Sequence, residues 1–187
     1  MSSLFSRTVQ QLKAGWAGKS PVLLFVLFFF GIMAVFYAFM QTSFYQHSFQ
    51  PFIVRINAQV ASFLLNILGQ GTHASGDLIA SNRASISIKR GCDALVPIFL
   101  FCAALLAFPA KWRYKGVGLG VGVAFLLLVN IIRIINLYWV KLYYPNAFDI
   151  MHLEVWQVIF ILLGILCWAV WMQWTQKKVL AQKSRQD

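Results

Sequence analysis

The sequence predicts an all-α polytopic membrane protein with four transmembrane helices, an extracytoplasmic amphipathic helix and a small β-hairpin. Hydrophobic residues make up 60% of the 187 residues, charged residues only 11%, and the mean hydropathy is +0.70. In soluble domains about a quarter of the residues are charged. Because the chain has the length of one domain, we expect residues 1–187 to form a single membrane-embedded domain.

Four apolar segments are the predicted spans, at about residues 21–40, 93–110, 117–140 and 154–174. Three of them reach the roughly 20 residues that a spanning helix needs. The second is shorter, but residues 94–110 carry no charge. The first has a longer apolar stretch than a signal peptide, and no small-residue cleavage site follows it, so we interpret it as a retained span.

The basic residues predict the orientation of these spans. The net charge of +11 comes mainly from Lys and Arg at both ends of the chain and at positions 111–115. By the positive-inside rule, both termini and the 111–115 loop are cytoplasmic, whereas residues 41–91 and 141–152 lie outside the cytoplasmic (inner) membrane. Charge placed beside apolar segments indicates a lipid bilayer as the partner and argues against nucleic acid.

The outer segment, residues 41–91, contains two predicted elements. Residues 50–70 carry a helical stripe of polar side chains, at Arg55, Gln59, Ser62, Asn66 and Gln70. This pattern favours an amphipathic helix in the membrane interface. The alternative, a fifth span, would place Cys92 inside against the positive-inside rule. Residues 77–80 and 85–88 flank a turn at 81–84 and predict the β-hairpin.

Candidate chemistry begins with Cys92, which directly follows Lys89, Arg90 and Gly91 at the outer end of the second span. Local positive charge favours the thiolate, which is the nucleophilic form of cysteine. Backbone N–H groups at the start of a helix would favour the anion further. Cys102 and Cys167 instead lie mid-span among apolar neighbours, where cysteine behaves as a small hydrophobic residue.

Arg133 lies inside an apolar stretch, where a charge costs roughly 2.5–3.5 kcal/mol on insertion scales. It sits seven residues, or roughly 10 Å of helix, below the outer end of its span at Val140. Such a cation must face a protein interior or a wet cavity. Asn130, one turn earlier, is expected to help orient the guanidinium. His152 begins the fourth span, again on the outer side.

A thiol, a cation and an imidazole from three different spans are thus predicted to meet at the outer face. Acyl transfer needs an activated nucleophile, a proton shuttle and a group that holds the developing oxyanion. Cys92, His152 and Arg133 supply these residue types. The sequence shows no metal-ligand spacing and no Gly-rich phosphate loop, so we expect no metal and no cofactor. The glycine-rich run 116–122 is interpreted as helix-packing material.

Two non-enzymatic alternatives remain at this point. One is a scaffold or transporter subunit with Arg133 as a structural or ion-pathway residue, although a transporter should show inverted repeats and none is visible. The other is an assembly partner for surface polysaccharide export.

Four motifs stand out, namely Arg90-Gly91-Cys92-Asp93-Ala94-Leu95, Asn130-Ile131-Ile132-Arg133-Ile134, His152 followed by Trp156-Gln157, and Leu106-Ala107-Phe108-Pro109-Ala110. With these motifs the chain resembles the exosortase/archaeosortase family, most closely its exosortase H-type branch, over about residues 86–171. This chain departs from many family members in two ways. It has Asp93-Ala94 after the cysteine where they have Ser-Gly or Asn-Gly, and it has four predicted spans where they have about eight.

The resemblance implies a membrane cysteine protease and transpeptidase that cleaves the C-terminal sorting signals of exported proteins. Such signals consist of a recognition motif, a transmembrane helix and a basic cluster, and the cleaved protein passes to an acceptor that the sequence does not identify. Cys92 would be the nucleophile, Arg133 the oxyanion-stabilising or substrate-orienting group, and His152 the general acid and base. Asp93, Asn130, Trp156 and Gln157 would be supporting residues.

Overall fold

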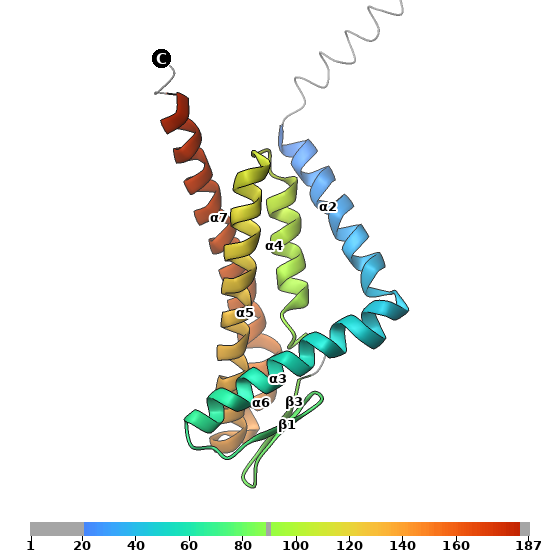
Figure 1. The fold of residues 1–187 in the computed structure, drawn as a ribbon, viewed down its shortest axis with the longest axis vertical. Coiled ribbons are helices and arrows are strands. Elements are labelled where there is room, and N and C mark those ends of the chain that lie inside the picture. The colour runs from blue at the N-terminus through green and yellow to red at the C-terminus, as the bar shows by residue number, and fades with distance from the viewer. Residues whose placement is uncertain (1–20, 89–90, 184–187) are drawn as a thin grey trace, which may run out of the picture.

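The computed structural model describes residues 21–88 and 91–183 (Figure 1). Four helices, α2, α4, α5 and α7, run along the long axis of the molecule, while α3 and the strands lie at one end of them (Figure 1). The main helices are α2 (Pro21–Met40), α3 (Gln50–Ile67), α4 (Leu95–Ala107), α5 (Trp112–Tyr143) and α7 (Trp156–Lys183). Short helical turns precede α3 and α7, namely η1 (Tyr45–Phe49), η2 (Pro145–Ala147), α6 (Phe148–Ile150) and η3 (Met151–Val155). The predicted all-α polytopic class is confirmed.

Three helical segments are long and apolar enough to cross a membrane, Val22–Met40, Trp112–Tyr143 and Pro145–Lys178. The second predicted span, 93–110, corresponds to the shorter apolar helix α4, which has 13 residues. It ends where Phe108 adopts extended backbone angles, as expected for a residue before proline. The last two spans extend further than predicted, because their helices continue through polar residues beyond the apolar stretch. α3 is not among the candidate spans.

The glycine-rich run brings α5 close to its neighbours through alternate glycines. A Cβ on Gly118 would lie 2.3 Å from Trp171 Nε1, and one on Gly122 would lie 2.2 Å from the Phe101 ring. Added Cβ atoms on Gly116 and Gly120 would meet nothing within 4 Å. The run is therefore a packing surface, as predicted, but only every second glycine carries the contact.

The predicted hairpin is present as part of a three-stranded antiparallel sheet. Its order is β1-β2-β3, with β1 at His73–Ser75, β2 at Leu78–Ala80 and β3 at Ser85–Ser87. β1 was not predicted from the sequence; it turns into β2 through Gly76, which has a φ of +62°. The Tyr138 hydroxyl on α5 lies 2.8 Å from Ser81 Oγ in the β2–β3 turn, so the sheet is fastened to a spanning helix.

Helix α3 departs from the predicted polar stripe at one position, Ser62. Arg55, Gln59 and Asn66 are not buried, but Ser62 is buried and its hydroxyl lies 2.9 Å from Thr72 Oγ1. Phe63, by contrast, is 65% exposed. The polar serine turns inward because the segment leading to β1 offers it a hydrogen-bond partner.

Candidate active site

Cys92 lies on the short segment between β3 and α4, and only 4% of its surface is exposed. Gly91 before it and Ala94 after it both have positive φ, at +92° and +62°. A left-handed alanine is strained, by roughly 1–3 kcal/mol, so surrounding contacts must hold this turn. The flanking residues Lys89 and Arg90, expected to favour the thiolate, lie outside the described residues.

The backbone N–H at the start of α4, expected to stabilise the Cys92 thiolate, instead donates to Asp93. α4 begins three residues after Cys92, and the Leu95 N–H donates to Asp93 Oδ1 at 3.2 Å. The other Asp93 oxygen accepts a hydrogen bond from Gln50 Nε2 at 3.0 Å. Asp93 thus accepts a hydrogen bond from the first residue of α4 and connects this helix to the start of α3. Sequence reasoning did not single out Gln50, since nothing local connects two residues 43 positions apart.

Arg133 reaches from α5 into the same site and is 4% exposed. Its Nη1 donates to the Gly91 carbonyl at 3.0 Å, and its Nη2 donates to Cys92 Sγ at 3.4 Å and to the His152 carbonyl at 3.2 Å. The guanidinium carbon lies 5.5 Å from the centre of the Phe160 ring. This cation therefore holds together the cysteine segment and the turn before α7.

The expected role of Asn130 in orienting that guanidinium is wrong. Asn130 is fully buried, and neither its amide nitrogen nor its amide oxygen has a hydrogen-bond partner. Arg133 points away from its own helix toward main-chain carbonyls of two other segments, and its Nε also has no partner. Helical spacing of three residues makes two side chains neighbours but does not make them bond.

His152 completes the group, with its Nε2 in hydrogen-bond contact with Cys92 Sγ. The residue lies in the π-helical turn η3, a rare geometry that recurs at functional sites. Its ring stacks on Phe148, with centroids 5.6 Å apart and an interplanar angle of 23°. The stacked ring and the irregular turn together fix the imidazole against the thiol.

Burial raises the pKa of the Cys92 thiol, and this is the largest effect on it. The positive charge of Arg133 acts against burial and lowers that pKa, while the carboxylate of Asp93 raises it. A thiol with a raised pKa needs a base to accept its proton, and His152 is in place to do so. The arrangement is suited to nucleophilic acyl transfer through a base-activated cysteine.

The two remaining predicted supporting residues lie in different surroundings. Trp156 is buried, and its Nε1 donates to Asn136 Oδ1 on α5 at 2.9 Å. Gln157 is exposed, and within the described chain its side chain has no hydrogen bond to the site. Trp156 therefore links the start of α7 to α5 one turn beyond Arg133, whereas the supporting role of Gln157 stays a prediction.

The cavity beside Cys92 and His152 has a volume of only about 10 Å³. That is room for about one water. It is lined also by Ile86, Ser87, Ile88, Ile134, Leu137 and Phe148. In this conformation a molecule much larger than water cannot enter the cavity.

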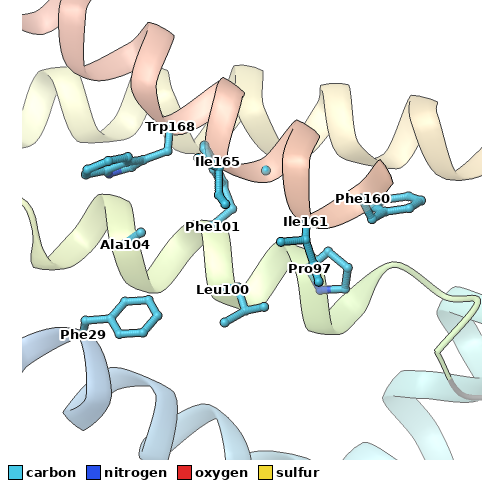
Figure 2. Close-up of a pocket in the computed structure, with 10 residues that line it drawn as sticks. Phe29, Pro97, Leu100, Phe101, Ala104, Phe160, Ile161, Ile165 and Trp168 are labelled. Atoms are coloured by element: carbon cyan, nitrogen blue, oxygen red, sulfur yellow. The ribbon is translucent and has the colours of Figure 1, made fainter. Parts of the chain in front are cut away.

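A larger pocket of about 280 Å³ opens between α4 and α7, with Phe29 of α2 facing it (Figure 2). Its lining is apolar and includes Pro97, Phe101 and Trp168. Phe160, the ring under Arg133, forms one end of it. The pocket carries no group that could act as an acid, base or nucleophile, so Cys92, Arg133 and His152 remain the candidate reactive groups.

In the described part of the chain, no group of three or more His, Cys, Asp or Glu side chains could hold a metal ion. A comparison with protein families matches residues 12–169 to a family described as transmembrane exosortase (Exosortase_EpsH). No curated protein and no solved structure matches the chain. The match includes the whole segment from Cys92 to His152.

Proposed function

The chain belongs to the transmembrane exosortase family, and we propose that it is a membrane cysteine peptidase and transpeptidase that cleaves C-terminal sorting signals. The observation that carries this proposal is the contact of a buried thiol with both an imidazole and a guanidinium, brought from three separate segments. The family match supports the general class of sorting enzyme, and this contact supports the assignment of roles.

In the proposed reaction, His152 Nε2 takes the proton of Cys92 Sγ as the sulfur attacks the carbonyl carbon of the scissile peptide bond. The resulting oxyanion is stabilised by the Arg133 guanidinium, whose Nη2 already lies beside the sulfur. The C–N bond then breaks, the leaving amine takes the proton from His152, and a thioester remains on Cys92. An acceptor, either water or an amine, gives its proton to His152, attacks the thioester and releases the thiol.

The proposed substrates are exported proteins with a C-terminal tail made of a motif, a transmembrane helix and a basic cluster. The tail would place its cleavage motif at the outer face of the cytoplasmic membrane, where the positive-inside rule puts Cys92 and His152. The acceptor is a nucleophile whose identity the site does not specify.

The test of the nucleophile is co-expression of a tailed candidate substrate with single cysteine variants. Cys92→Ala should abolish processing, followed by the mass of the substrate on a gel. Cys102→Ala and Cys167→Ala are matched controls and should retain processing. Each removes a thiol that makes no hydrogen bond to Arg133 or His152. The wild-type enzyme should also accumulate a thioester with the substrate fragment when the acceptor is limiting.

Normal processing by the Cys92→Ala protein at wild-type abundance would remove the nucleophile assignment. The non-enzymatic scaffold would then be the better interpretation of the chain.

The proposed topology is tested separately by reporter fusions in the loops. A fusion at Ala110 should report the cytoplasm, and one at Asn146 should report the opposite compartment. An extracytoplasmic signal at Ala110 would contradict a site at the outer face.

A further inference from the structure

β3 forms one edge of the three-stranded sheet, and its free side has a defined set of main-chain groups. The Ile88 N–H donates to the Asp77 carbonyl at 2.8 Å, which places the main-chain groups of residues 86 and 88 toward β2. Pairing in an antiparallel ladder alternates along each strand. The N–H and C=O groups of Ser85 and Ser87 therefore point away from β2. Neither residue's main chain is hydrogen-bonded to any other described residue on that side.

This free edge borders the candidate active site. Ser87 lines the same small cavity as Cys92 and His152, and the chain runs from Ser87 to the nucleophile in five residues. Because that cavity is too small for a peptide, main-chain groups along its rim are the nearest groups able to hold one. Ser85 is exposed, so the outer end of the edge is accessible.

The edge is also held rigidly. Ile86 and Ile88 are 7% and 4% exposed and anchor one face of the strand in the core. On the other face the Ser87 hydroxyl donates to Asp77. Natural sheets usually block a free edge with charged residues, proline or a covering segment. β3 has neither a charged residue nor a proline; it packs against α5 and presents two small serines beside Cys92.

We propose that this edge of β3 binds the extended segment of the substrate next to its scissile bond, as an added strand. The inference rests on the proposed function. Main-chain hydrogen bonds would give binding that does not depend on side-chain identity, and the direction of the strand would carry the peptide toward Cys92. At about 3.3 Å per residue, Ser85 and Ser87 register with two alternate residues of the substrate.

The first test uses the wild-type enzyme and a synthetic peptide copying the processed region of the tail. Methylation of one peptide nitrogen at a time removes one donor from the substrate. An added strand predicts that the loss of kcat/KM alternates with position, each sensitive bond costing about 3- to 10-fold, as for one hydrogen bond. A profile without a two-residue period would overturn the proposal.

The second test removes a donor from the enzyme. Ser87→Pro loses an outward N–H without touching the ladder to β2, a position where sheets tolerate proline. Ser87→Ala is its reference, since it removes only the hydroxyl. KM for the peptide should be about 3- to 10-fold higher in the proline variant, while the rate of Cys92 alkylation by iodoacetamide stays equal in both.

Equal KM values in the proline and alanine variants would also overturn the proposal, and Ser85→Pro repeats the measurement at the second outward position. Failure of the proposed function has a different signature, namely peptide cleavage by Cys92→Ala.

Discussion

Replacement of Arg133 by lysine tests whether the buried cation acts through its shape or only through its charge. The guanidinium spans three acceptors, with one nitrogen on the Gly91 carbonyl and the other on Cys92 Sγ and the His152 carbonyl. Lysine keeps the charge but has a single nitrogen, and it lacks the planar fork of arginine. It cannot bond both sides of the site with the same geometry.

The expected loss follows from the number of contacts. If lysine loses one charged hydrogen bond, the cost is about 1.5–3 kcal/mol. At about 1.4 kcal/mol per factor of ten, kcat/KM should fall roughly 10- to 150-fold. Arg133→Ala loses all three contacts and the charge, so its activity should be lower still.

The assay is processing of a tailed substrate at matched protein abundance, with Cys92 alkylation as a second readout. Arg113→Lys is a suitable control, because Arg113 donates to the Tyr114 hydroxyl at 2.9 Å at the opposite end of α5. It should leave processing unchanged. Full activity of Arg133→Lys would show that a positive charge is sufficient. It would refute the requirement for a guanidinium that bonds both sides of the site.

Two further predictions concern charge at the nucleophile and packing of α5. Because the carboxylate of Asp93 raises the pKa of Cys92, Asp93→Asn should lower it, and the pH profile of alkylation should shift toward lower pH; an upward shift would contradict this sign. Gly122→Ala forces a methyl group against the Phe101 ring and should destabilise the protein by about 1–3 kcal/mol, measured by thermal unfolding in detergent. Gly120→Ala, which meets open space, should be at least as stable as wild type, because alanine is the better helix former.

The spans and the grouping of Cys92, Arg133 and His152 could be predicted from the sequence, because both depend on charged residues that stand beside or inside apolar segments. A charged residue in an apolar helix and basic clusters beside spans are visible without a structure. The grouping followed from the orientation of the spans, since it needed only the end of each helix and not its rotation. The catalytic roles of the three residues stay predictions.

Contacts that depend on the rotation of a helix about its axis, or on residues far apart in the chain, could not be predicted from the sequence. Gln50 bonds Asp93 across 43 residues, and no pattern in either segment signals this pair. Asn136 was equally visible to sequence reasoning as Asn130, both three residues from Arg133, yet only Asn136 has a partner, Trp156. The choice between them depends on which neighbour packs on each face of α5.

The contacts of Arg133 also explain why a cation is tolerated inside a spanning helix. Two of its three hydrogen bonds go to main-chain carbonyls, of Gly91 and His152, and only one goes to the thiol. Buried charges are tolerated when hydrogen bonds satisfy them, so most of the compensation comes from groups that no side-chain substitution removes. Loss of the Cys92 thiol should therefore leave the arginine bound and the two segments together. For this reason Cys92→Ala separates chemistry from assembly, whereas any change at Arg133 affects both.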